Sequence, residues 1–480
     1  MAAFLQGIIK TLKTLQLRNT QRGKSQSFNG TSYLEVTPIN GMILRSAYTI
    51  TSRNNNYLTY FRRGSAYFNE ANKSLDEDKY VTNVWENTLT YAKYVGRHDF
   101  LGLVGFSTEN YSQLHFGMSG SGFPDDDVLN DFGSAAVIGA LEESFTENAL
   151  VSSFARLTYK YNKKYILSGT IRRDGSSRFG PDKRWGIFPS AAAAWLISEE
   201  KFMQTGKLSK IFSYLKLRGS AGRTGSQNLG NYSWRTGVSG TVYNNLPAII
   251  PTSLGNPDLR WEETLMLDLG LDFGLFKDKI TGTFGLYEKR TKDLIYSTPV
   301  PPSSSFSSVS SNVAAMSNKG IEFDIKGQVI KRKNLTGTLD FNISRNISRV
   351  TRFNDQVKAL DLPGASTRRM RIEIGGRTGQ WYGYKTANRL FVTQEEIIAL
   401  QSQTATGARQ FYRTGTEAPG DLYFMDLNGD GKITVDDQTY LGSAEPKFSG
   451  GFGGTVIYKN FYVNATFSYA YGHTRLGHYQ

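Results

Sequence analysis

The feature that most constrains the fold of this chain is a regular alternation of apolar and polar residues in paired segments. Over residues 155–161, Ala155, Leu157, Tyr159 and Tyr161 alternate with polar residues, and the alternation resumes over 165–171 after a short polar turn at 162–164. Successive side chains of a β-strand point to opposite faces of the sheet. Each pair of segments therefore predicts an antiparallel hairpin with one apolar face and one polar face.

The same pattern recurs at residues 264–286, 321–343 and 452–469, with short turns at 277–279, 331–334 and 459–460. The connections at the other end of the hairpins are long, at about 175–186, 224–260, 296–318 and 350–447. Short turns on one side and long loops on the other are typical of outer-membrane barrels, as are aromatic residues next to the short turns. Such residues flank three of these turns: Tyr161, Tyr165, Phe273, Phe276, Tyr458 and Phe461. A soluble β-sandwich also has one apolar face per strand, but these two features favour a membrane barrel.

Composition excludes several other classes of protein. No segment approaches the roughly 18 consecutive apolar residues of a membrane helix, which excludes helical spans. The absence of cysteine excludes disulfides, thiol catalysis and thiolate metal sites. The formal net charge is +14, but the basic residues are scattered along the chain. We therefore favour basic loops that face anionic headgroups or other chains, rather than a protein that binds nucleic acid.

We predict an all-β fold, a transmembrane antiparallel β-barrel with about fourteen strands in this chain. Residues 1–80 hold early barrel strands, and 81–349 hold barrel strands with long extracellular loops. Residues 350–447 form one long extracellular loop with a short helix at 395–400, and 448–480 form a barrel hairpin that ends the chain. The first residues lack the uninterrupted apolar core of an export signal, because Lys10 and Lys13 fall within it.

The chain carries a set of motifs in a defined order and spacing. They are YILSGTIRRDGSSRFG at 165–180, RWGIFPS at 184–190, LKLRGSAGRTG at 215–225, WEET at 261–264, NKGIE at 318–322, PGDL at 419–422, DLNGDG at 426–431 and PKFSGG at 446–451. Over residues 80–475, this set resembles the SusC/RagA family of TonB-linked outer-membrane proteins, TonB-dependent receptors of the Bacteroidetes type. The resemblance implies a barrel of about 22 strands with a plugged lumen. It also implies a SusD-like lipoprotein over the extracellular mouth and import of glycan oligosaccharides or peptides, driven by the TonB complex from an outer-membrane location.

The chain differs from the resembled family at both ends. We identify no plug domain, no TonB-contacting segment and no export signal, and we expect further strands after residue 480. We therefore expect a truncated or split gene, or an incomplete gene model, whose product does not transport alone. The alternative is a secreted or surface β-protein that binds calcium and glycan without transporting anything.

Residues 426–437 have the spacing of a calcium-binding loop. Hard calcium ions prefer six to eight oxygen ligands, and the positions of such a loop fold its oxygens around one ion. Asp437 occupies the last position, where glutamate is usual, and an Asx/Gly turn without metal is the other interpretation. The expected ligands are Asp426, Asn428, Asp430, Lys432 through its carbonyl, Thr434 and Asp437, holding a structural calcium ion.

Other candidate residues lie near strand ends and in loops. Arg172, Asp174 and Arg178 are expected either to line the lumen or contact a plug, or to anchor a loop through ion pairs. Trp234 and Trp381 are expected to be exposed in long loops, where they are candidates for stacking on a glycan. The chain has no nucleophile elbow, phosphate-binding loop or dinucleotide fingerprint, so we predict no enzyme activity.

Overall fold

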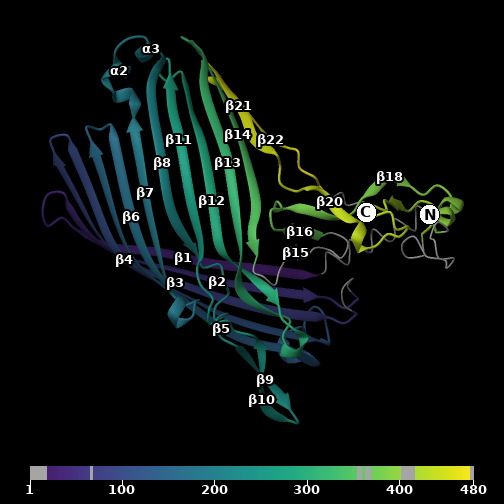
Figure 1. Ribbon diagram of the computed structural model, residues 1–480. Coiled ribbons are helices and arrows are strands. Elements are labelled where there is room, and N and C mark those ends of the chain that lie inside the picture. Colours follow the sequence, from purple (N-terminus) through teal and green to yellow (C-terminus); the bar gives the residue numbers. More distant parts are fainter. Residues whose placement is uncertain (1–18, 65–68, 354–358, 363–368, 402–416, 476–480) are drawn as a thin grey trace.

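The computed structural model describes residues 19–64, 69–353, 359–362, 369–401 and 417–475. Fourteen strands form one antiparallel sheet, in which each strand pairs with the next along the chain except where loop insertions intervene. The strands of this sheet are β1 (Thr20–Val36), β2 (Met42–Phe61), β3 (Asn72–Val95), β4 (His98–Ser121), β5 (Val137–Tyr161), β6 (Tyr165–Ser176), β7 (Trp185–Leu196), β8 (Phe212–Ser226), β11 (Glu262–Leu275), β12 (Ile280–Pro299), β13 (Ser308–Arg332), β14 (Leu335–Phe353), β21 (Phe448–Tyr458) and β22 (Phe461–Tyr471). The sheet curls strongly, so that its first strands pass behind the later ones in Figure 1.

The remaining elements are insertions between strands of this sheet. The inserted strands are β9 (Gly237–Tyr243), β10 (Leu246–Ser253), β15 (Ala359–Leu362), β16 (Arg369–Glu373), β17 (Gln380–Tyr384), β18 (Thr386–Leu390), β19 (Leu422–Phe424) and β20 (Gln438–Ser443), and the helices are α2 (Lys201–Gln204), α3 (Leu208–Ile211) and α4 (Gln394–Gln401). In Figure 1, the β9–β10 hairpin extends below the large sheet, and β16, β18 and β20 extend beside it. We find no helix in the described residues that is both long and apolar enough to cross a bilayer.

The predicted all-β fold and its hairpins are confirmed. β5 and β6 meet at residues 162–164, β11 and β12 at 276–279, β13 and β14 at 333–334, and β21 and β22 at 459–460. The two-residue turn between β21 and β22 has Lys459 at a φ of 51°, in the left-handed region that such hairpin turns require. Helix α4 includes the predicted helical residues 395–400.

The strands are longer than the alternating pattern indicated. β5 and β13 each have 25 residues, whereas we expected about ten per strand. The predicted long loop at 296–318 is consequently wrong, because β12 continues to Pro299 and β13 begins at Ser308. Within 296–318, the strands continue through backbone hydrogen bonds between residues that are largely serine and threonine. These residues do not alternate between apolar and polar, so the sequence pattern of a half-buried strand is missing. Residues 1–18, in the predicted early-strand segment, lie outside the described residues.

The two faces of the large sheet have the reverse of the usual exposure. Leu267 and Leu269 of β11 are exposed, whereas Asp268 between them is half-buried. In the register, Asp268 lies opposite Ser220 of β8, Ser220 lies opposite Ala192 of β7, and Ala192 lies opposite Ser168 of β6. Directly opposite residues share a face, so Asp268 and Ser168 lie on the same face of the sheet. We call the face that carries Asp268 and Ser168 the inner face, and the face that carries Leu269 the outer face. Soluble proteins bury such apolar rows, so this exposure fits a sheet whose outer face meets lipid.

Aromatic side chains gather on the outer face at the short-turn end. Tyr161, Tyr165 and Trp195 follow one another across β5, β6 and β7, with ring centroids 6.3 and 6.4 Å apart. The Tyr165 hydroxyl donates to Glu200 at 2.6 Å, and Trp195 Nε1 donates to the same carboxylate at 3.2 Å. Rings with an apolar body and a hydrogen-bonding tip suit the headgroup level of a bilayer.

Buried apolar side chains do not form one central core. Apart from Met203, those of the described residues gather in four separate clusters, which include loop residues and the ends of strands rather than their middles. The largest cluster joins residues from β7 and from two connections of the large sheet, β6–β7 and β8–β11: Phe179, Phe188, Leu229, Leu259 and Trp261. The fold therefore relies on the strand ladder along its length and on apolar packing at the long-loop end.

Candidate functional site: the inner face and the long loops

The inner face carries a hydrogen-bonded group of polar and aromatic side chains on β3 and β4. His115 lies opposite Asp78 in the register, with Nδ1 and Oδ1 3.0 Å apart. Gln113 Nε2 donates to the same carboxylate at 3.2 Å, and the Tyr111 hydroxyl donates to Gln113 at 3.2 Å. These half-buried polar groups contact one another and also offer hydrogen-bond donors and acceptors to water or a solute on the inner face of the sheet.

A second group on the inner face is charged and joins β8 to β11. Arg218 Nη1 lies 2.8 Å from Asp268, its Nε lies 3.4 Å from Asp272, and Lys216 Nζ lies 3.7 Å from Asp272. Gly270 makes room for this arrangement, because a Cβ there would lie 2.5 Å from the guanidinium carbon of Arg218. The guanidinium thus spans two carboxylates on one strand, and together with Lys216 it balances their charge.

A third group extends the inner face across β12, β13 and β14. The Tyr287 hydroxyl donates to Asn346 at 3.2 Å, and the Ser348 hydroxyl donates to Asn318 at 2.5 Å. Lys289 lies 5.2 Å from the centre of the Tyr287 ring. The three groups give the inner face balanced charges, amides and phenols, which suit reversible contact with polar solutes.

The structure separates the three predicted polar residues near the top of β6. Arg172 Nε donates to both oxygens of Asp174 at 2.8 and 2.9 Å, and Arg172 Nη2 donates to Ser152 at 2.8 Å. Arg178 instead donates to the backbone oxygen of Gln227 at 3.2 Å. Arg172 and Asp174 share the inner face, while Arg178 joins two long loops.

The resemblance motifs meet in the largest apolar cluster. The Trp261 ring lies 5.1 Å from that of Phe179 and 5.4 Å from that of Phe188. Trp261 Nε1 donates to the backbone oxygen of Arg184 at 2.8 Å, and a Cβ at Gly180 would lie 2.7 Å from the backbone oxygen of Pro257. These residues pack the β6–β7 connection against the segment that leads into β11. The packing holds these two connections together at the long-loop end of the sheet.

The two tryptophans that we expected to be exposed are half-buried. Trp234 packs against the largest cluster, with Arg235 4.6 Å above its ring. Trp381 Nε1 donates to the backbone oxygen of Thr474 at 3.0 Å. Contacts between distant loops cover part of each ring, and the sequence pattern carried no sign of those contacts.

The predicted calcium loop is closed by hydrogen bonds from its own backbone. Asp426 accepts from Gly429 and Gly431, each at 2.7 Å. Asp430 accepts from Lys432 at 2.8 Å. The two glycines have φ values of 77° and 82°, which allow the sharp turn.

The last carboxylate of the loop is fully buried. Asp437 accepts from Leu427 at 2.8 Å through one oxygen and from Thr434 at 2.7 Å through the other. Burial alone works to raise the pKa of Asp437, but the N–H groups of Thr434, Leu427 and Asn428 outweigh it and hold the pKa below its usual value. The carboxylate is therefore charged near neutral pH. One of its oxygens accepts from the N–H groups of both Leu427 and Asn428, and the other accepts from that of Thr434 alone.

Within the described residues, no group of three or more His, Cys, Asp or Glu side chains converges closely enough to hold a metal. A calcium site in this loop would therefore need a mixed donor set, in which the Asn428 amide oxygen, the Thr434 hydroxyl and the Lys432 carbonyl add to the aspartate oxygens. All of these are oxygens, the donor type that calcium prefers.

Residues 10–439 match the family model described as TonB dependent receptor-like, beta-barrel. The chain belongs to this family. TonB-dependent receptor P39 of Formosa agariphila is 32% identical over 418 residues, which are 81% of this chain and 39% of that protein. TonB-dependent receptor SusC of Bacteroides thetaiotaomicron is 29% identical over 402 residues, which are 80% of this chain and 37% of that protein.

The fold of this chain matches that of a solved structure. The structure of the RagAB peptide importer in its closed-closed state matches with a TM-score of 0.80 and 24% identity, over 95% of this chain and 49% of that chain. The resemblance to the SusC/RagA type is confirmed by the family model and by the similarity to SusC. The chain spans less than half the length of each of these three relatives.

Sequence reasoning missed most of the inner-face residues of this receptor. Asp268 and Arg218 stand at polar positions of alternating segments, and that alternation was the available signal that they share a face. Their pairing depends on which residue of β8 lies opposite which residue of β11. The alternating pattern restricts this register to every second residue but does not select one.

Proposed function

We propose that this chain forms part of the outer-membrane wall of a TonB-dependent importer for polar solutes too large for porins. The observation that carries the proposal is the exposed apolar outer face opposite a hydrogen-bonded polar inner face. A wall of this kind separates hydrocarbon from an aqueous passage. The proposed location is the outer membrane, with the long loops outside the cell and the short turns in the periplasm.

The activity is proposed for the whole protein to which residues 1–480 contribute, because the chain spans less than half of its relatives. In that protein, the TonB complex supplies the energy, and a SusD-like lipoprotein covers the long-loop end. The packed loop cluster around Trp261 supports this arrangement, because a lid requires a fixed rim to close on.

The proposed substrates are glycan oligosaccharides or peptides. Both classes carry many hydrogen-bonding groups, and the inner face offers paired charges, amides and phenols rather than an apolar pocket. Arg172 and Asp174 contribute to this inner lining beside Ser152. The half-buried rings of Trp234 and Trp381 are proposed to stack on substrate through the surface that remains uncovered.

The uptake proposal is tested by deleting the full-length gene from its host and measuring uptake of fluorescent oligosaccharides and oligopeptides. We expect uptake of one of the two classes to be lost, while uptake of porin-sized sugars is unchanged. Unchanged uptake of both large classes would refute the proposal. Recovery of the protein as a folded monomer in plain buffer would instead favour a soluble β-protein that binds glycan.

We also propose that residues 426–437 bind one structural calcium ion, through Asp426, Asn428, Asp430, Lys432, Thr434 and Asp437. The ion's role is to hold the connection between β19 and β20 in one conformation. Calcium is titrated calorimetrically into the chelator-treated full-length protein. We expect one binding heat that Asp430→Ala removes and Lys432→Ala keeps, because Lys432 offers its backbone carbonyl rather than its side chain. The absence of any heat in the unmodified protein would disprove the site.

A further inference from the structure

The apolar band of the outer face ends abruptly on four neighbouring strands. Toward the long-loop end, the next outward-facing residue after the band is charged on each of them. The successive pairs, apolar or small residue first, are Ala221 and Arg223 on β8, Leu265 and Glu263 on β11, Leu286 and Glu288 on β12, and Ile321 and Lys319 on β13. On β14, the outward-facing Arg345 interrupts the apolar row between Ile343 and Ile347. If the outer face meets lipid, this boundary lies at the level of the outer-leaflet headgroups.

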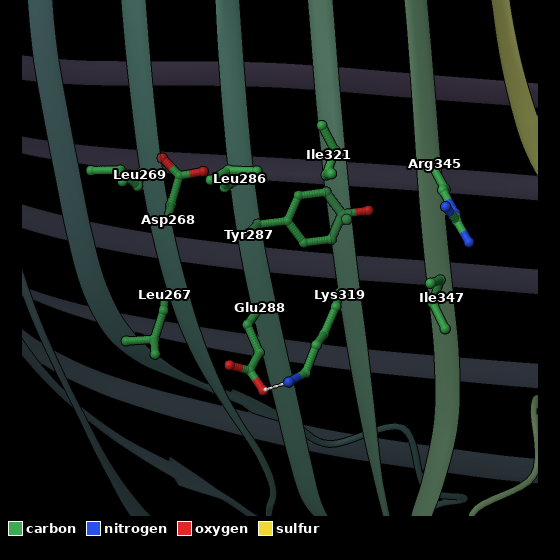
Figure 2. Close-up of a pocket in the computed structure, with 11 residues that line it drawn as sticks. Leu267, Asp268, Leu269, Leu286, Tyr287, Glu288, Lys319, Ile321, Arg345 and Ile347 are labelled. Carbon is green, nitrogen blue, oxygen red and sulfur yellow. Dashed lines mark ion pairs between the residues drawn. The ribbon is translucent and has the colours of Figure 1, made fainter.

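Two adjoining depressions straddle this boundary. The first, of about 500 Å³, is an apolar groove on the outer face between β11, β12, β13 and β14, lined by Leu267, Leu269, Leu286, Ile321 and Ile347. The second, of about 540 Å³, lies toward the long loops and is charged. Glu288 and Lys319 line both, and Figure 2 shows this ion pair below Leu286 and Ile321.

The charged depression has more cations than anions. Its charged lining consists of Arg223, Arg290, Lys292, Lys319, Glu263 and Glu288, a formal surplus of two positive charges. Each carboxylate is shared between two of the cations. Glu288 lies 2.9 Å from Arg290 and 3.2 Å from Lys319, and Glu263 lies 3.0 Å from Lys292 and 4.0 Å from Arg223.

The shared cations remain available to a further anion. The side chains of Arg223, Arg290, Lys292 and Lys319 are between 53% and 64% exposed. Each cation has more donors than one carboxylate oxygen can use. Arg345, at the rim of the apolar groove, adds another positive charge and lies 5.5 Å from the centre of the Phe448 ring.

We infer that the two depressions together bind one phosphorylated glycolipid of the outer leaflet. The charged depression takes the phosphate, to which arginine and lysine donate charge-assisted hydrogen bonds. The apolar groove takes the first part of an acyl chain. A lipid fits better than a soluble anion because the acyl groove continues the charged depression on the outer face, away from the passage. The inference rests on the proposed outer-membrane placement.

The test uses the full-length protein in detergent, titrated with lipid A, an acylated disaccharide that carries two phosphates, and followed by native mass spectrometry. The combined variant Arg290→Gln and Lys319→Gln should bind lipid A about ten-fold more weakly. The matched control, Lys331→Gln with Arg332→Gln, removes two exposed cations from the opposite end of β13 and should bind as the unmodified protein does. Dephosphorylated lipid A should bind more weakly than lipid A to the unmodified protein.

Equal lipid A binding by both double variants would overturn the inference. So would displacement of lipid A by inorganic phosphate at a similar concentration, because the apolar groove would then contribute nothing. Uptake measurements distinguish failure of the lipid site from failure of the proposed function. A double variant Arg290→Gln and Lys319→Gln that loses lipid A binding but keeps normal uptake supports the lipid site. Loss of uptake in the gene deletion tests the proposed function and is independent of lipid binding.

Discussion

Replacement of Trp261 tests whether the long-loop end is held by one apolar cluster. Trp261 is 6% exposed and contacts the rings of Phe179 and Phe188. Removal of so large a buried ring usually costs about 3–5 kcal/mol. Its Nε1 also donates to the backbone oxygen of Arg184, which accepts from Ser176 N at 3.1 Å as well. Trp261→Ala should therefore release the β6–β7 connection locally.

The assay is hydrogen–deuterium exchange of the full-length protein in detergent, followed for peptides that cover residues 175–188. A local loss of 3 kcal/mol raises exchange about a hundredfold, since each 1.4 kcal/mol is a factor of ten. Trp261→Phe keeps most of the ring and loses only the hydrogen bond, so it should raise exchange less. Trp381→Ala, in another loop, should leave these peptides unchanged. Unaltered exchange over 175–188 in Trp261→Ala would refute the role of the cluster.

Three further predictions concern the faces of the sheet and its short-turn end. Leu269→Lys on the outer face should destabilise the inserted protein in urea by about 2–4 kcal/mol, whereas Ser220→Lys on the inner face should be nearly neutral; equal losses would contradict the assignment of the faces. Gly270→Val should displace Arg218 from its two carboxylates, lowering the midpoint of urea unfolding, while Gly169→Val, where a Cβ meets nothing within 4 Å, should not. The pKa of Glu200 is held below its usual value by hydrogen bonds from the Tyr165 hydroxyl, the Trp195 indole and Lys164. The stability that the Glu200 carboxylate contributes is therefore complete above the pKa it has in the unfolded chain, and it is lost as the pH falls through the lower pKa of the folded state. Glu200→Gln should remove this part of the acid sensitivity, measured by unfolding at a series of pH values.

The hairpins could be predicted from the sequence because their signals are local. Alternation over seven or so residues identifies a half-exposed strand, and the polar residues between two such segments identify the turn. The start of β5 at Val137 could not be predicted in this way, because Glu142, Glu143 and Ser144 interrupt the alternation between the apolar band and the start of the strand. Backbone pairing alone extends the strand there.

The candidate site could be predicted only in part. The candidate calcium loop could be predicted because its candidate ligand oxygens lie within twelve consecutive residues. The pairing of Arg218 with Asp268 joins residues 50 positions apart, and the hydrogen bond from Trp381 to Thr474 joins residues 93 positions apart. Such contacts depend on strand register and on loop packing, which no local pattern specifies.

We propose above all that the apolar face of the sheet meets lipid and that the polar face meets water. The chain has no cysteine of its own, so single cysteines can carry a spin label at Leu167 or Leu269 on the outer face and at Ser168 or Ser220 on the inner face. Collisions with oxygen, which partitions into lipid, and with a water-soluble nickel chelate are then measured in liposomes. The outer labels should collide mainly with oxygen and the inner labels mainly with nickel. Equal accessibility of neighbouring positions 167 and 168, or the reverse preference, would contradict the account.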